Sequence, residues 1–136
     1  MPPRDPDAGF VTLAGRALAL RCPRCGSGGA VRGLVMAEVC RGCGLRFERE
    51  PGYWIGAMII DTAVTFATFL LVFVGGMVLT WPDVPWTGLL VGTIAVNAVV
   101  PVVFYPWAKT LWAAMELSWH PLEPTEIEAA DSRAPS

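Results

Sequence analysis

The sequence has few charged residues and a single histidine, His120. Only 16% of its 136 residues are charged and 54% are hydrophobic, whereas roughly 25% of the residues in soluble domains are charged. No lysine or arginine occurs between Arg49 and Lys109. This shortage of charge excludes an ordinary soluble domain and indicates that much of the chain lies in lipid. The residues also provide no recognisable catalytic apparatus, so we expect a protein that is not an enzyme.

Two long apolar runs account for the missing charge. They cover about residues 57–80 and 87–107, and each reaches the roughly 20 residues that a helix needs to cross a bilayer. Nothing else in the chain is apolar enough to bury both runs in a soluble core. The sequence therefore predicts a membrane α-helical hairpin of two transmembrane helices over residues 51–107. Glycines near the outer ends of both helices are expected to pack against each other: Gly75, Gly76, Gly88 and Gly92.

The distribution of charge and tryptophan predicts the orientation of this hairpin. Eight arginines precede residue 50, whereas the turn between the runs carries Asp83 and no cation. Positive charge favours the cytoplasmic side, so we expect a multi-pass protein with both termini in the cytoplasm. All six tryptophans fall at the boundaries of the predicted spans or just outside them, as in the aromatic belts of membrane proteins.

Two polar residues inside the spans are candidates for a function. Asp61 shares a helical face with two threonines, and Asn97 lies near the middle of the second span, four residues before Pro101. An ionisable group at the centre of a bilayer costs about 2.5 to 3.5 kcal/mol on insertion scales, which makes Asp61 a functional candidate by default. The simpler interpretation is that Asp61 orients its helix near the cytoplasmic interface and that Asn97 holds the hairpin or a dimer together.

The cysteines form the strongest chemical motif. Two CxxC pairs occur, and the glycine after each pair permits a tight turn. This spacing matches a four-cysteine zinc ribbon, in which four thiolates bind Zn²⁺ tetrahedrally and leave no open position, so the metal is structural. We expect a small N-terminal β zinc ribbon over residues 18–50, with strands within 34–39 and 45–48. The predicted metal ligands are Cys22, Cys25, Cys40 and Cys43.

Three other uses of these cysteines remain open. Disulfides are disfavoured by the reducing cytoplasm. A redox CxxC site needs an exposed thiolate of low pKa, usually in a thioredoxin-like order of strands and helices that the chain lacks. Iron fits the same ligands in a site of rubredoxin type and is a minor alternative to zinc. His120 is interpreted as an interfacial residue and not as a further ligand.

Arginines surround the cysteine motif and continue to the first span. Their position beside a span favours contact with anionic lipid headgroups over a nucleic-acid patch, so no nucleic acid is expected as a partner. The candidate membrane-surface residues are Arg21, Arg24, Arg46 and Arg49.

The flanking segments are shorter and less apolar. Residues 8–20 are interrupted by Arg16 and lack a convincing cleavage site, so we expect no signal peptide. The N-terminal segment 1–17 is instead expected to contain a short amphipathic helix that rests on the ribbon or on the membrane surface. Residues 108–120 have an apolar side at helical spacing, which predicts an interfacial helix or an extension of the second span. The acidic segment 121–136 is predicted to be disordered.

This combination of parts resembles a bacterial family described as domain of unknown function 983. The resemblance is carried by LALRCPRCGSGGAVRG at 18–33, VCRGCG at 39–44, GYWIGAMIID at 52–61 and FYPWAKTLWAAMELSWHPLE at 104–123. It implies a small inner-membrane protein with an N-terminal zinc ribbon, two spans and no established activity. It also implies a weak association with the assembly of cytochrome oxidase. Relatives commonly show a more basic aromatic stretch where this chain has YPWAK.

These features favour an accessory or assembly protein of the bacterial inner membrane. We expect its ribbon to dock a cytoplasmic partner and its hairpin to pack in the lipid bilayer against a membrane protein, such as a respiratory complex, or against a second copy. One alternative is a small transporter or proton-relay component built by oligomerisation around Asp61 and Asn97. Another is a thiol redox protein that uses the CxxC pairs.

Overall fold

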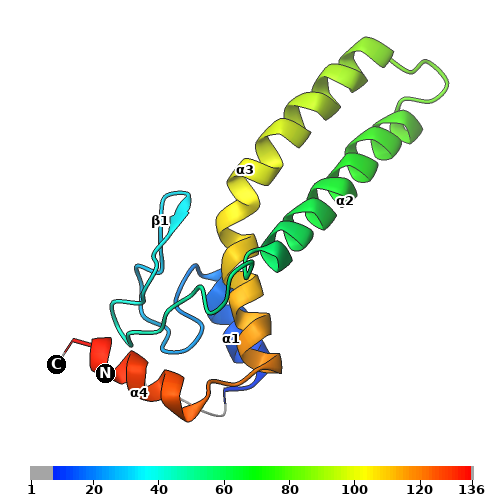
Figure 1. Ribbon diagram of the computed structural model, residues 1–136. Coiled ribbons are helices and arrows are strands. Elements are labelled where there is room, and N and C mark those ends of the chain that lie inside the picture. The colour runs from blue at the N-terminus through cyan, green and yellow to red at the C-terminus, as the bar shows by residue number, and fades with distance from the viewer. Residues whose placement is uncertain (1–7, 136) are drawn as a thin grey trace.

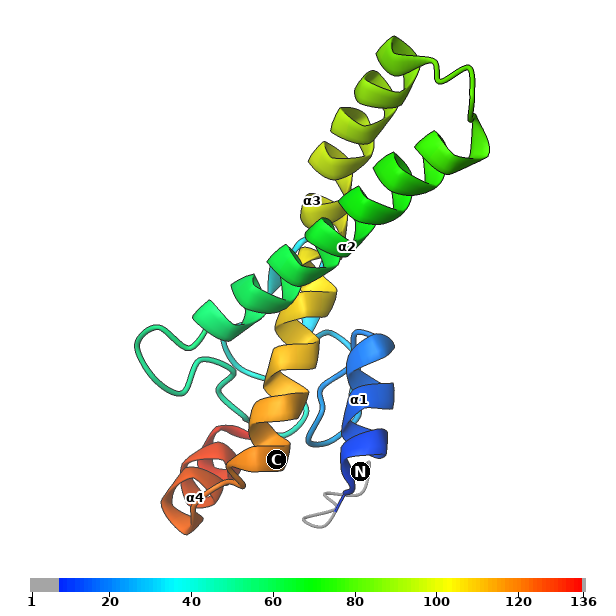
Figure 2. The same cartoon turned by 90° about the vertical axis from the view of Figure 1, so that its right-hand side faces the viewer.

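The computed structural model describes residues 8–135, so residues 1–7 of the predicted N-terminal segment and the last residue of the predicted tail lie outside the described residues. Figure 1 shows two long helices that project from a smaller body. In both views the hairpin turn lies at one end of the molecule, and α1 and α4 lie at the other end (Figures 1 and 2). The elements in chain order are α1 (Phe10–Leu18), β1 (Val31–Arg32), β2 (Val35–Met36), α2 (Ile55–Leu79), α3 (Trp86–Trp119) and α4 (Pro124–Arg133).

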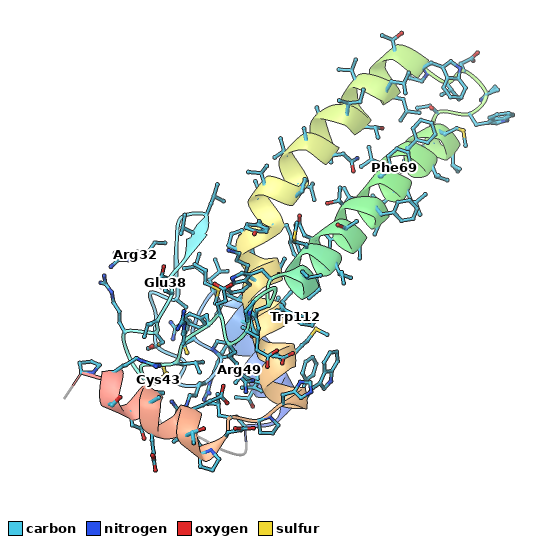
Figure 3. All side chains as sticks on the ribbon, viewed as in Figure 1. Arg32, Glu38, Cys43, Arg49, Phe69 and Trp112 are labelled. Carbon is cyan, nitrogen blue, oxygen red and sulfur yellow. The ribbon has the colours of Figure 1, made fainter. Side chains whose placement is uncertain are left out.

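The two long helices, α2 and α3, contain the apolar runs found in the sequence. Their 25 and 34 residues correspond to about 37 and 51 Å at 1.5 Å per residue. Only 6% of the most apolar 18-residue window of each helix is buried, and large side chains such as Leu71 and Leu79 are exposed. Side chains of this hairpin stand clear of the rest of the molecule in Figure 3. Both helices are therefore long and apolar enough to cross a membrane.

The second long helix continues without a break as far as Trp119. Residues 108–120 are thus not a separate interfacial helix, and the other interpretation, an extension of the second apolar run, is correct. Pro101 and Pro106 lie inside α3, and the helix changes direction around residue 100 in Figures 1 and 2, as expected of proline in a helix. The hydroxyl of Thr110 donates to the carbonyl of Pro106 at 3.1 Å.

The first helix, α1, is the amphipathic helix expected near the N-terminus. Its buried residue Ala17 packs in one cluster with Ala114 of α3. Side chains of α3 also bind the last carbonyls of α1. Trp107 Nε1 donates to the carbonyl of Leu18 at 3.1 Å, and Thr110 Oγ1 donates to the carbonyl of Ala17 at 3.0 Å. The helix therefore rests mainly on α3.

The prediction of disorder for residues 121–136 is wrong, because this segment contains α4. The helix begins with Pro124 in its first turn and with a capping box formed by Glu123 and Glu126. Ala130 is 1% exposed and lies against Gly44 of the ribbon. Composition did not reveal this helix, because two of its acidic side chains, Glu126 and Asp131, are paired with arginines of the ribbon.

The predicted glycine contacts between the long helices are largely absent. Gly76 approaches α3 through the side chain of Leu89, whereas a Cβ added at the other three predicted glycines would meet nothing within 4 Å. A close approach occurs instead near the body, where a Cβ on Gly56 would overlap the indole ring of Trp112. The two helices therefore approach closely both at Gly76 and at Gly56.

Candidate metal centre

Each CxxC pair lies in a tight backbone turn. The amide of Gly26 donates to the carbonyl of Cys22 at 2.8 Å, and the amide of Gly44 donates to the carbonyl of Cys40 at 2.9 Å. These two glycines have φ values of +71° and +68°, a region that favours glycine. The expected role of the glycine after each pair is confirmed.

A small antiparallel sheet joins the two pairs. It pairs β1 with β2 around a turn at Gly33, where φ is +63°. The strand expected within residues 34–39 is therefore present, but its partner precedes it in the chain. Residues 45–48 alternate buried and exposed as expected. They lie antiparallel to residues 38–40: Val39 and Arg46 form a bridge, the amide of Cys40 donates to the carbonyl of Leu45 at 2.8 Å, and the amide of Phe47 donates to the carbonyl of Glu38 at 3.0 Å. The expected adjoining segment is therefore hydrogen-bonded to the chain that precedes it, although the pairing is too short to form a strand of its own.

The fold brings the four sulfur atoms together in the interior of the ribbon. All four cysteines are buried, and their sulfurs lie within 4.8 Å of one another. The distance is 3.8 Å between Cys22 Sγ and Cys43 Sγ and 3.7 Å between Cys25 Sγ and Cys40 Sγ. A tetrahedron with metal–sulfur bonds of about 2.3 Å has edges of about 3.8 Å, whereas a disulfide bond measures about 2.05 Å. The arrangement is compatible with one metal ion held by four cysteines.

A serine that the sequence analysis did not identify lies between the two pairs. Ser27 Oγ is 3.0 Å from Cys25 Sγ and 3.3 Å from Cys40 Sγ. The amide of Gly42 donates to the same Cys40 sulfur at 3.4 Å, and a Cβ on Gly42 would come within 2.5 Å of the serine hydroxyl. Such donors stabilise thiolate ligands. The sequence did contain a signal for this role. Ser27 lies two residues after the second cysteine of a CxxC pair, and a side chain at that position can reach back to the cysteine sulfur.

Hydrogen bonds within the cluster shift the pKa values of the thiols in opposite directions. Hydrogen bonds to Cys25, Cys40 and Cys43, together with burial, raise the pKa of Cys22. The hydrogen bond from Cys22 lowers the pKa of Cys25 to about 6 and also lowers the pKa of Cys40. Metal ions bind thiolates and not thiols. Against the lowering effect of its hydrogen bond with Cys22, the hydrogen bond to Cys40 and burial raise the pKa of Cys43. The thiolate form is therefore favoured at Cys25 and Cys40 and disfavoured at Cys22 and Cys43.

An arginine of α1 holds the first cysteine pair. Arg16 Nη1 donates to the carbonyls of Pro23 and Arg24 at 3.1 and 3.0 Å. Its side chain also passes over Gly26. This guanidinium satisfies two carbonyls of the turn and fixes the N-terminal helix to the cluster.

Two of the four predicted membrane-surface arginines face α4 instead. Arg49 makes two hydrogen bonds to the carboxylate of Glu126, at 2.7 and 2.8 Å, and Arg24 lies 3.8 Å from Asp131. The two arginine side chains are only 14% and 12% exposed. The sequence analysis did not anticipate these acidic partners at the C-terminal end of the chain. Arg21 and Arg46 are the exposed members of the set, and headgroup contact stays a prediction for all four.

The cluster is attached to the long helices through a shared core. The buried residues around the sulfurs include Phe47 of the ribbon and Ala113 of α3, and Trp54 packs against them. The ammonium of Lys109 lies 4.5 Å from the centre of the Trp54 ring and 4.8 Å from that of Tyr105. Trp112, labelled in Figure 3, lies where the hairpin meets the body.

The remaining predicted residues lie apart from the sulfurs. His120 is exposed and pairs with Glu116 at 3.1 Å, as expected of a residue that is not a ligand. Asn97 Nδ2 donates to the carbonyl of Thr93 at 2.9 Å. Asp61 Oδ1 is buried and has no hydrogen-bond partner among the described residues. Neither Asn97 nor Asp61 therefore connects α2 to α3 by a hydrogen bond in the described part of the chain.

Comparisons with protein family models, curated proteins and solved structures find no match for this chain. The resemblance noted in the sequence therefore stays a prediction. The function is argued from the cysteine cluster and the helices that carry it.

Proposed function

We propose that the protein is a non-enzymatic accessory or assembly protein of the bacterial inner membrane. In this proposal a structural zinc ribbon docks a cytoplasmic partner, while the hairpin packs against a larger membrane complex, such as a respiratory complex, or against a second copy. The observation that carries the proposal is the shared core of the cluster and α3, in which Phe47 and Ala113 pack together. One continuous helix thereby joins a metal-binding module to an apolar hairpin.

Exposed apolar surface supports a position in the membrane. The hairpin buries almost none of its most apolar windows, and water disfavours such surface by roughly 25 cal/mol per Å². The hydrocarbon core is about 30 Å thick, so α3, at about 51 Å, is long enough to project beyond it. The projecting end carries the ribbon and its arginines, which favours a cytoplasmic location for that end and for both termini.

The closed set of ligands supports a structural metal. Four buried thiol groups leave no open coordination position for a substrate. Zinc suits a tetrahedral thiolate site without redox chemistry, and iron is the alternative with the same geometry. Metal analysis of the purified protein distinguishes the two.

Crosslinking in native membranes tests the accessory role. The full-length protein should resist extraction without detergent and should form a specific crosslinked product with another membrane or cytoplasmic protein. A Cys43→Ser variant, which loses one ligand, should stay in the membrane but lose any product made through the ribbon. If the wild-type protein and the Cys43→Ser variant give the same crosslinked products, the proposal that the ribbon docks a partner is wrong.

A second candidate is a proton-relay or transport component, supported by the buried and unpartnered Oδ1 of Asp61. Asp61→Asn should then abolish transport in proteoliposomes without affecting assembly, and unchanged transport would exclude this role. A thiol redox role requires cysteines that react. One bound metal ion per chain, together with no alkylatable thiol in the native protein, would exclude that role as well.

A further inference from the structure

The C-terminal helix α4 covers one face of the ribbon but buries little of itself. Ala130 is its one fully buried residue among those described, and Ile127, its largest apolar residue, is 37% exposed. A Cβ on Gly44 would overlap the backbone of Ala130. A helix of ten residues is only marginally stable alone in water. The helical state of α4 therefore depends on the surface that it contacts.

Charge provides the other contacts between α4 and the ribbon. Glu126 accepts two hydrogen bonds from Arg49, and Asp131 lies 3.8 Å from Arg24. Arg24 also donates to the carbonyl of Cys43 at 3.4 Å. Arg24 thus connects the acidic helix directly to the cysteine cluster, whereas Arg49 connects it to the end of α3 by donating to the carbonyl of His120 at 3.0 Å. Cys43 and Arg49 lie on the side of the body that adjoins α4 in Figure 3.

The packing of α4 on this face is incomplete. A pocket of about 110 Å³ remains between the helix and the ribbon. Ala129 is too small to fill it, although two leucines provide an apolar part of the wall. The pocket is lined by Leu45, Arg46, Arg49, Leu122, Glu126, Ala129 and Arg133.

We propose that this face of the ribbon is a docking surface for an acidic helix of a partner protein, and that α4 occupies it in the free protein. The surface is defined by Arg24, Gly44, Leu45 and Arg49, and the inference rests on the proposed accessory role. A partner helix fits if it places carboxylates five residues apart, as Glu126 and Asp131 are, with a small residue over Gly44. A side chain larger than Ala129 at the equivalent position adds apolar contact in the pocket. Such a helix competes with α4 for the surface, because α4 buries little surface of its own.

A fluorescent peptide of residues 121–136 tests this proposal against the full-length protein in mild detergent. The wild-type protein should exclude the peptide, because its own α4 occupies the surface. In a Glu126→Arg variant the reversed charge faces Arg49, so α4 detaches and the peptide should bind about tenfold more tightly or better. A peptide with Ala129→Leu should bind this variant about fivefold more tightly again, because it fills the pocket.

Two control variants isolate the contact. Glu128→Arg makes the same charge change at an exposed position of α4 and should exclude the peptide as the wild type does. The double variant Arg49→Glu with Glu126→Arg restores an ion pair and should exclude the peptide again. Equal affinity of the peptide for the wild type and for Glu126→Arg overturns the proposal, provided that both retain the metal.

Glu126→Gln provides a milder change if Glu126→Arg loses its metal. Hydrogen exchange of the amides in residues 124–133 should then increase while exchange in residues 22–47 stays the same. Unchanged exchange in residues 124–133 overturns the proposal. The peptide assay needs no partner protein, so its result is separate from the crosslinking test. Peptide binding without any crosslinked partner contradicts the accessory role, and a crosslinked partner without peptide binding contradicts the docking surface.

Discussion

Ser27 Oγ lies 3.3 Å from Cys40 Sγ, although Ser27 belongs to the turn of the first cysteine pair and Cys40 begins the second. The same hydroxyl lies 3.0 Å from Cys25 Sγ. One hydroxyl thus lies beside a sulfur from each half of the cluster and can donate its single hydrogen to either. This contact would make the hydroxyl a positioning group for the cysteine ligands of a bound metal.

Replacing Ser27 with alanine should weaken metal binding by about 10- to 100-fold, the range found for hydrogen-bond partners of metal ligands. Competition with a chromogenic chelator on the full-length protein measures this affinity. Ser118→Ala, a serine at the C-terminal end of α3, provides the control and should leave the affinity unchanged. A change of less than about twofold in Ser27→Ala would show that the hydroxyl does not support the ligands.

Gly56→Ala should destabilise the protein by about 1 to 3 kcal/mol, because the added methyl group overlaps the indole of Trp112. Gly75→Ala in the same helix meets nothing within 4 Å and should be neutral or slightly stabilising, since alanine is the better helix former. Thermal unfolding in detergent, followed by tryptophan fluorescence, compares the two variants. Equal unfolding temperatures would contradict the close contact at Gly56.

Acid should release α4 from the ribbon. The hydrogen bond from Arg49 lowers the pKa of Glu126 below its ordinary value of 4.5. Because the pKa is lower in the folded protein, the ion pair contributes fully above pH 4.5 and is lost as the pH falls through the folded-state value. Hydrogen exchange of residues 124–133 should therefore rise in that acidic range, with the metal signal recorded in parallel.

Glu126→Gln is the control for the acid experiment. This variant lacks the titrating carboxylate, so exchange in residues 124–133 should be fast already at neutral pH and should show little further change in acid. If acid increased hydrogen exchange in this variant as much as in the wild type, a group other than Glu126 would be responsible for the release of α4.

Leu71→Arg should reduce insertion of the hairpin. Leu71 is 75% exposed on α2, and an arginine in the middle of a membrane helix costs about 2.5 to 3.5 kcal/mol on insertion scales. Leu34→Arg is the matched control, since Leu34 is 52% exposed in the turn of the ribbon and faces water in the proposed topology. Membrane fractionation after expression compares the two. Equal amounts in the membrane fraction would contradict contact between α2 and lipid.

The cysteine cluster and the long helices were predictable because both depend on local patterns. Two CxxC pairs with following glycines specify two tight turns, and the length of an apolar run specifies a helix that can cross a bilayer. Neither inference requires knowledge of distant contacts. The C-terminal end of the second long helix was harder to predict. The part of this helix after Pro106 packs against α1 and the ribbon, and these distant contacts cannot be read from the local sequence.

The helix α4 and its arginines were not predictable in the same way. Arg49 and Glu126 are 77 positions apart, and no local periodicity links them. A polar segment with one buried alanine has the composition of a disordered tail until its partner surface is known. The glycine contacts failed for a related reason, because depth in the helix does not determine which face Gly88 and Gly92 present.

The length of α3 has a consequence for signalling between the two parts of the molecule. Its apolar half and the half that bears the ribbon belong to one backbone helix, and α1 and the cysteine core both pack on its far end. A transmembrane helix adjusts its tilt to the thickness of the surrounding bilayer. In the proposed topology such a tilt would move the end of α3 that carries the cysteine cluster, so the position of the ribbon would depend on the lipid or protein environment of the hairpin.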